Sequence, residues 1–133
     1  MTGWHACPTT ATVPEMRLIG WVCATLLGSA AIAHADGPVV QAVEAREQGG
    51  AWRFSVTLSH PDTGWDHYAD GWEVVAPDGT RLGYRPLAHP HVNEQPFTRS
   101  QSGIEIPNGL ETVLVRGRDN GGDWGPSFEF ELP

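Results

Sequence analysis

The stretch WRFSVTLS, residues 52–59, alternates apolar and polar side chains at every position. Successive side chains of a β-strand point to opposite faces of the sheet, so this pattern predicts a strand with one buried and one exposed face. A period of two recurs further along the chain, whereas helical periodicity is absent after residue 48. The sequence therefore predicts an all-β domain.

Several further short strands are separated from this one by turn residues. An opening strand is expected near Val39–Val43, and two turns are expected at Asp78-Gly79 and Asn108-Gly109. The other expected strands are marked by Trp72 and Val74; Leu82, Tyr84 and Leu87; Ile104 and Ile106; Val113 and Val115; Phe128, Phe130 and Leu132. About seven short strands of this kind favour an antiparallel immunoglobulin-like or fibronectin-like β-sandwich.

The N-terminal region has the pattern of a secretory signal peptide. Met16-Arg17 opens a short positive segment, Leu18 to Ile32 is apolar, and Ala33-His34-Ala35 is a small-x-small cleavage site. We therefore interpret residues 16–35 as a signal peptide cleaved after Ala35. The apolar run is too short for a membrane span, so no membrane insertion is expected after cleavage.

This interpretation divides the chain into three parts. Residues 1–15 precede a good signal and add nothing to it, so we interpret them as a spurious extension ahead of Met16 as the true start. Residues 36–133 form the predicted single β-sandwich domain, whose length suits one hydrophobic core. The expected location is the periplasm or the exterior of the cell.

The composition of the predicted domain limits its chemistry and its partners. Cys7 and Cys23 both precede residue 36, so the domain has no disulfide, thiolate ligand or cysteine nucleophile. The chain has no lysine, and from residue 36 onward seven arginines face fifteen acidic residues. An acidic surface argues against binding to nucleic acid and to anionic membranes.

Four histidines of the predicted domain fall between positions 60 and 91, in the motifs His60-Pro61, His67-Tyr68 and His89-Pro90-His91. Imidazole is the commonest protein ligand for transition metals. His60 has the parity of the apolar face of strand 52–59. Pro90 favours extended backbone around it, so the side chains of His89 and His91 project to the same side.

In an antiparallel sandwich, the exit of one strand and the loop after a hairpin can lie at the same pole. The sequence therefore predicts a metal site whose ligands are His60, His67, His89 and His91. Auxiliary oxygen ligands are expected from Asp62, Asp66 and Glu94. The cofactor would be one transition-metal ion, copper, zinc or iron, and nitrogen ligands without thiolate favour Cu(II), Zn(II) or Ni(II) over Cu(I).

Each of these residues also has a purely structural explanation. Loop histidines are often simply solvated, and aromatic residues at the corner of a sandwich often close the core, which would account for Trp65, Tyr68 and Trp72. Solvated loop and turn positions would account for Asp62, Asp66, Asp70 and Asp78. The run Asp119-Asn120-Gly121-Gly122-Asp123 is interpreted primarily as a turn and only secondarily as a cation site.

The string HPDTGWDHYADGWEV, residues 60–74, resembles the superoxide reductase (desulfoferrodoxin-like) motif, and DNGGDWG, residues 119–125, is distantly similar to that family's Cys-Asn-x-His-Gly-x-Trp segment. The family is an immunoglobulin-like sandwich that binds iron through four histidines and one cysteine. The resemblance implies that His60 and His67 are two equatorial ligands. Asp119 stands where the cysteine would be and the C-terminal histidine is missing, so the family's redox chemistry is not implied.

The first functional hypothesis is therefore a small periplasmic or secreted protein that binds a transition metal through its histidine cluster. The alternative is a non-enzymatic accessory module in which the loops around Trp65, His67 and residues 89–97 bind a protein or a glycan. A superoxide-reductase-like enzyme is a distant third. No catalytic residues are assigned, because Ser59 and His60 point to opposite faces of a strand and no glycine-rich phosphate loop is present.

Overall fold

The computed structural model describes Gly3 and residues 37–133. The predicted signal peptide, residues 16–35, and the predicted extension, residues 1–15 apart from Gly3, lie outside the described residues. Seven strands follow one another in the described part of the chain: β1 (Val39–Gln48), β2 (Ala51–Ser59), β3 (Ala69–Val75), β4 (Arg81–Pro86), β5 (Phe97–Ile104), β6 (Thr112–Asp119) and β7 (Phe128–Glu131). No helix in these residues has the length and apolar character needed to cross a bilayer.

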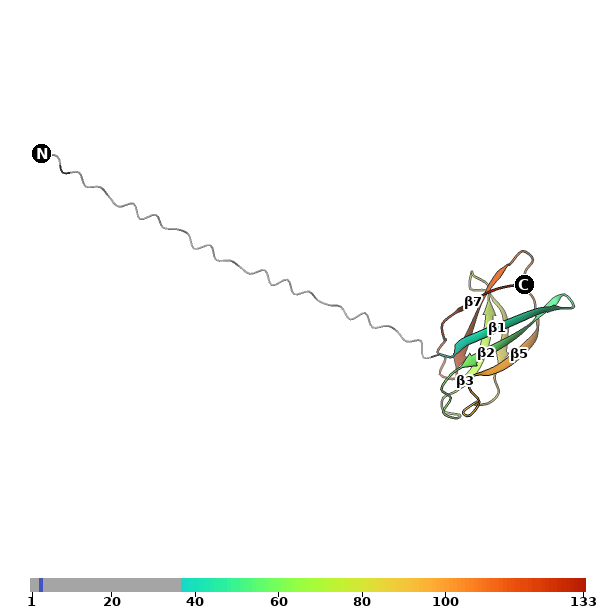
Figure 1. The fold of residues 1–133 in the computed structure, drawn as a ribbon, viewed down its shortest axis with the longest axis horizontal. Helices are drawn as coiled ribbons and strands as arrows, with labels where there is room; N and C mark the ends of the chain where they lie inside the picture. Colours follow the sequence, from blue (N-terminus) through green and yellow to red (C-terminus); the bar gives the residue numbers. More distant parts are fainter. Residues whose placement is uncertain (1–2, 4–36) are drawn as a thin grey trace. The chain divides into compact units, whose positions relative to one another are not determined.

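The strands form two antiparallel sheets, which confirms the predicted all-β sandwich. One sheet has the order β1-β2-β5 and the other has the order β4-β3-β6-β7. β1 and β2 form a long hairpin (Figure 1), in which Gln48 pairs with Ala51 across the two-residue turn Gly49-Gly50. Both turn glycines have positive φ, which is the backbone that such tight hairpin turns require and that glycine adopts without strain.

The hydrophobic core lies between the two sheets and follows the alternation in the sequence. Phe54, Val56 and Leu58 of β2 are fully buried. They belong to one cluster with the buried residues of the facing sheet, which include Trp72, Val74, Val113 and Val115. Because alternate residues share a face, the intervening polar residues of β2 point outward.

Two strands are longer than the apolar pattern predicts. β1 continues to Gln48 rather than ending near Val43, because its second half is the exposed side of the hairpin with β2. β5 begins at Phe97, well before Ile104, and its interior is polar. Hydroxyl groups bind across the β2–β5 pair, Ser55 to Ser100 and Thr57 to Thr98, each at 2.7 Å, so this strand is stabilised by pairing without an alternating apolar face.

The outer face of the four-stranded sheet holds a buried carboxylate. Glu73 of β3 is 2% exposed, and its two oxygens accept hydrogen bonds from Arg81 Nε at 2.6 Å and Arg116 Nε at 2.7 Å. The guanidinium of Arg116 also lies 4.4 Å from the ring centroid of Trp124. Long side chains therefore cover the central strand on its outer face, so β3 is buried on both sides.

The start of β1 is held against the segment that follows β6. Gly37 and Gly125 approach each other so closely that a Cβ at either position would overlap backbone atoms there. Gly125 N–H also donates a 2.8 Å hydrogen bond to the carbonyl of Gly117 in β6. Only glycine allows this approach of two backbones.

Candidate functional site

Two of the predicted histidines, His60 and His67, lie together at the pole of the sandwich where β2 ends and β3 begins. His60 directly follows β2 and is 2% exposed, in agreement with its parity. His67 is half-buried in the loop before β3, and its ring centroid is 4.7 Å from that of His60. β6 ends at the same pole, because Asp119 pairs with Ala69 at the start of β3.

These elements bring three residues whose side chains are able to bind metals into one group: His60, His67 and Asp119. One ring nitrogen of each histidine and one carboxylate oxygen of Asp119 lie within 4.8 Å of one another. In a tetrahedral site, ligand atoms about 2.1 Å from the metal lie roughly 3.4 Å apart. The three donor atoms are therefore near enough to one another for a single ion to bind them after at most small side-chain movements.

Asp62 fixes the ring of His60. The side chain of Asp62 is fully buried, and its Oδ1 accepts a 2.6 Å hydrogen bond from His60 Nδ1 and a 3.0 Å bond from the backbone N–H of Ala69. Its Oδ2 accepts the backbone N–H of His91 at 2.8 Å. A carboxylate can only accept, so Nδ1 of His60 carries a proton, and in the neutral imidazole the lone pair of Nε2 is then available to another partner.

Asp119 presents one free oxygen. Its Oδ1 accepts the backbone N–H groups of Gly121 and Asp123, each at 2.9 Å, which folds residues 119–123 into a tight turn. Its Oδ2 is buried and has no hydrogen-bond partner within residues 37–133, and the same is true of His60 Nε2. An unpaired buried polar atom costs about 1–3 kcal/mol, so two of them in one small group point to a ligand that would satisfy both.

Asn120 holds the His67 loop beside Asp119. Its side-chain oxygen accepts the N–H of Tyr68 at 3.1 Å, and its Nδ2 donates to the carbonyls of Trp65 and Asp66, both at 3.2 Å. Its own backbone N–H donates to the carbonyl of Tyr68 at 2.9 Å. Four hydrogen bonds from one residue therefore connect the loop that carries His67 to the turn that begins with Asp119.

The environment of the group affects the pKa of the neighbouring residue Asp70. Burial raises the pKa of Asp70, and the negative charge of Asp119 adds to this effect. The guanidinium of Arg118, 3.6 Å from Asp70, acts in the opposite direction. Two carboxylates and one guanidinium therefore lie close together at this end of β3 and β6.

His89 and His91 lie at the same pole but form a pair of their own, with ring centroids 4.6 Å apart. The ring of His91 stacks on Phe97 at 3.8 Å, and its Nε2 is 2.9 Å from Arg99 Nη2. A guanidinium can only donate, so Nε2 of His91 is occupied as an acceptor and has a positive charge beside it. Burial lowers the pKa of His91, and Arg99 lowers it further.

The structure thus separates the predicted ligands. The described part of the chain brings His60 and His67 together and adds Asp119, for which the sequence predicts first a turn and only second a cation site. The predicted auxiliary ligand Asp62 supports a ligand rather than facing the group. Asp66 is exposed, and Glu94 lies 3.5 Å from Arg99, so neither belongs to the group.

The aromatic residues near the group have different environments. Trp72 is fully buried in the core, as expected of a residue that closes a sandwich. Trp65 is 67% exposed, and its ring makes an edge contact with Tyr68 at 5.6 Å. The core therefore accounts for Trp72 and leaves the exposed surface of Trp65 without a role in packing.

Comparisons with known proteins give limited similarity. No protein-family model matches the sequence. The chain is 54% identical over 71 residues to a protein of Halomicrobium mukohataei named "Putative lipoprotein", and the alignment covers 53% of this chain and 34% of that protein. The chain thus spans about a third of the length of this curated relative. Among solved structures, hypothetical protein PH1083 from Pyrococcus horikoshii OT3 has 16% sequence identity and a TM-score of 0.46, over 73% of this chain and 88% of that chain.

Proposed function

We propose that this protein binds one divalent transition-metal ion through His60, His67 and Asp119. The observation that carries the proposal is the convergence of the three side chains, with His60 Nε2 and Asp119 Oδ2 both buried and unpartnered in the described domain. A bound metal ion would accept both lone pairs and remove the cost of leaving them unpaired. It would also neutralise part of the negative charge around Asp70 and Asp119.

The surroundings of His60 support this proposal. Metal-binding histidines usually donate their second ring N–H to a carboxylate or a carbonyl, which fixes the ring and raises its basicity. Asp62 has this relation to His60 at 2.6 Å. Asp62 is itself held by two backbone N–H groups, so the free nitrogen of His60 has a fixed direction before any metal arrives.

The donor set indicates which metals fit. Two imidazoles and one carboxylate, without thiolate, suit Zn(II), Cu(II) and Fe(II). Three protein ligands leave at least one coordination position for water or another molecule. His89 and His91 are left out of the proposed ligand set, because neither belongs to the group of converging donor atoms and Arg99 occupies the Nε2 atom of His91.

The resemblance noted in the sequence supports the same three residues. His60 and His67 are the histidines of the superoxide-reductase-like string, and Asp119 is the residue that stands in place of that family's cysteine. We propose binding and not superoxide reduction, because a carboxylate does not supply the electron donation of an axial thiolate. The lipoprotein relative supports a location outside the cytoplasm, where a small accessory protein would carry or sense the metal.

The test is a calorimetric titration of the untagged, metal-free protein with Zn(II), Cu(II) and Fe(II). We expect at least one metal to bind with a dissociation constant below about 1 µM. Asp119→Asn keeps an amide oxygen for the turn N–H groups but replaces the free oxygen with NH2, so it should weaken binding at least tenfold, roughly the effect of disturbing a metal site. His67→Ala should weaken it similarly.

His89→Ala is the matched control, because His89 is an exposed histidine at the same pole and outside the group. It should bind metal as the unmodified protein does. Binding weaker than about 1 µM for all three metals would refute the proposed function. Equal losses in His89→Ala and His67→Ala would refute the proposed ligand set.

A second candidate function, an interaction module for a protein or a glycan, is favoured by Trp65. A large aromatic side chain that is 67% exposed and held on a fixed loop is typical of a binding surface. Trp65→Ala should leave metal affinity unchanged and abolish retention of the protein on a glycan array or on immobilised envelope proteins. Retention that persists in Trp65→Ala would exclude this role for the tryptophan.

A further inference from the structure

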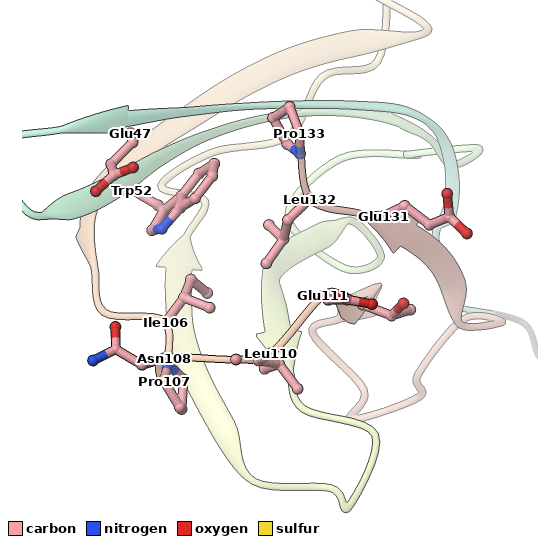
Figure 2. A pocket seen from close by; sticks show the side chains of 12 residues that line it. Glu47, Trp52, Ile106, Pro107, Asn108, Leu110, Glu111, Glu131, Leu132 and Pro133 are labelled. Atoms are coloured by element: carbon pink, nitrogen blue, oxygen red, sulfur yellow. The ribbon is translucent and has the colours of Figure 1, made fainter.

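A cleft of about 540 Å³ lies at the pole opposite the metal-ligating group, where β2 begins, β5 ends and β6 begins. Figure 2 shows the side chains of Trp52, Ile106 and Leu132 grouped around it and Leu110 at its lower edge. All four are half-buried and pack against the core of the sandwich. A volume of this size falls in the range of small-molecule sites.

The walls of the cleft are fixed by backbone hydrogen bonds. Leu110 N–H donates to the carbonyl of Pro107 at 3.2 Å, which closes the turn at Asn108-Gly109. Leu132 N–H donates to the carbonyl of Glu111 at 2.8 Å, which holds the segment after β7 to the segment before β6. The cleft is therefore formed before any ligand enters.

Its rim is acidic. Glu47, Glu111 and Glu131 line the cleft, and no basic residue does. None of the three glutamates forms a salt bridge within residues 37–133, in contrast to Glu73 on the outer face. Glu47 pairs directly with Trp52 across the β1–β2 hairpin, so a carboxylate and an indole share one wall. This pairing offers a cation both an opposite charge and the face or edge of an aromatic ring.

We propose that this cleft binds a small primary alkylammonium compound. Charge complementarity excludes an anionic ligand and favours a cation. The exposed parts of Trp52, Ile106, Leu110 and Leu132, which come from three segments, would take the hydrocarbon part, while the ammonium group remains near Glu47 at the rim. This arrangement places each half of the ligand in the surroundings that it prefers, as a lysine stem lies on apolar surface with its charged end in water.

The test compares three probes that share one hydrocarbon tail: hexylammonium, hexanol and hexanoate. Each is titrated into the isotopically labelled protein, and the shifts of the Trp52 indole and of the Leu110 and Leu132 methyl groups are followed by NMR. We expect millimolar binding of hexylammonium, about fivefold weaker binding of hexanol and the weakest binding of hexanoate. The preference for hexylammonium over hexanol should decrease when the salt concentration is raised from about 20 to 500 mM.

Variants test the acidic rim separately from the apolar side chains. Glu47→Gln should weaken hexylammonium binding about two- to fivefold and leave hexanol unchanged, because one exposed charge pair is lost. Glu129→Gln is the matched control, since Glu129 is an exposed glutamate of β7 that does not line the cleft. Equal affinities for the amine and the alcohol, or equal losses in the two variants, would overturn the proposal. The proposal would also be overturned if Ca²⁺ shifted the NMR signals of Trp52, Leu110 and Leu132 at a lower concentration than hexylammonium does.

Discussion

Replacing Asp62 with asparagine should damage both the stability of the domain and its proposed metal site. The carboxylate of Asp62 accepts hydrogen bonds from His60 Nδ1 and from the backbone N–H groups of Ala69 and His91. An asparagine has one acceptor oxygen, and its NH2 group can only donate. In one orientation the NH2 group faces the N–H of His91 and leaves that buried donor without a partner.

In the other orientation the NH2 group faces the ring of His60. Nδ1 must then accept, and the proton of the neutral imidazole moves to Nε2, the nitrogen assigned to the metal. Loss of one buried hydrogen bond costs about 1–3 kcal/mol, which corresponds to a fall in Tm of roughly 4–8 °C for each kcal/mol in a domain of this size. Disturbing the partner of a metal-binding histidine typically weakens metal affinity about 10- to 100-fold.

Two measurements separate these effects. Thermal unfolding with a chelator present reports the stability of the metal-free protein, and calorimetric titration at 20 °C reports metal affinity while the variant is folded. Asp66→Asn is the control, because Asp66 is an exposed aspartate of the same loop, and it should change neither quantity. A folded Asp62→Asn protein with unchanged metal affinity would refute the role assigned to Asp62.

Three further predictions concern other parts of the structure. Asn120→Ala should speed amide hydrogen exchange in residues 63–68 and weaken metal binding about tenfold, because it removes three side-chain hydrogen bonds to that loop. Exchange rates equal to those of the unmodified protein would contradict this prediction. The pKa of His91 is lowered in the folded state, so below about pH 6.5 the unfolded state binds more protons than the folded state does. The contribution of His91 to the free energy of unfolding should therefore be complete above about pH 6.5 and should decrease as the pH falls toward the folded pKa. Urea unfolding at pH 5 and pH 7.5 should therefore show a smaller loss in His91→Phe than in the unmodified protein, and equal losses would contradict the assignment. Glu73→Gln should lower the free energy of unfolding by about 1–2 kcal/mol, since a buried carboxylate is lost between two partly exposed arginines, whereas Glu129→Gln should change it by less than about 0.5 kcal/mol in the same urea experiment.

The strands that bury one face were predictable from the sequence, and the polar ones were not. Residues 52–59 alternate because β2 has one face in the core, and the position of His60 follows from the same parity. β5 lacks this signal, because residues 98–102 are polar on both faces and are stabilised by hydroxyl pairs with β2. Such pairing depends on a partner more than 40 residues away in the chain, so no local pattern reveals it.

The candidate site was predictable only where a single segment determines it. His60 and His67 belong to one short stretch, and its resemblance to a known iron-binding motif drew attention to both. Asp119 joins them through the pairing of β3 with β6, which brings residues 69 and 119 together. The signal in the sequence that could have identified Asp119 was its alignment with the cysteine ligand of the superoxide reductase motif. The separation of His91 depends on Arg99, whose position follows from the unpredicted start of β5.

The contact between Gly37 and Gly125 has a mechanical consequence. Gly37 lies just before β1, and Gly125 lies just after the turn that begins with Asp119 and is bonded to Gly117 of β6. Tension on the chain at residue 37 would therefore act on the segment that follows the Asp119 turn as well as on β1.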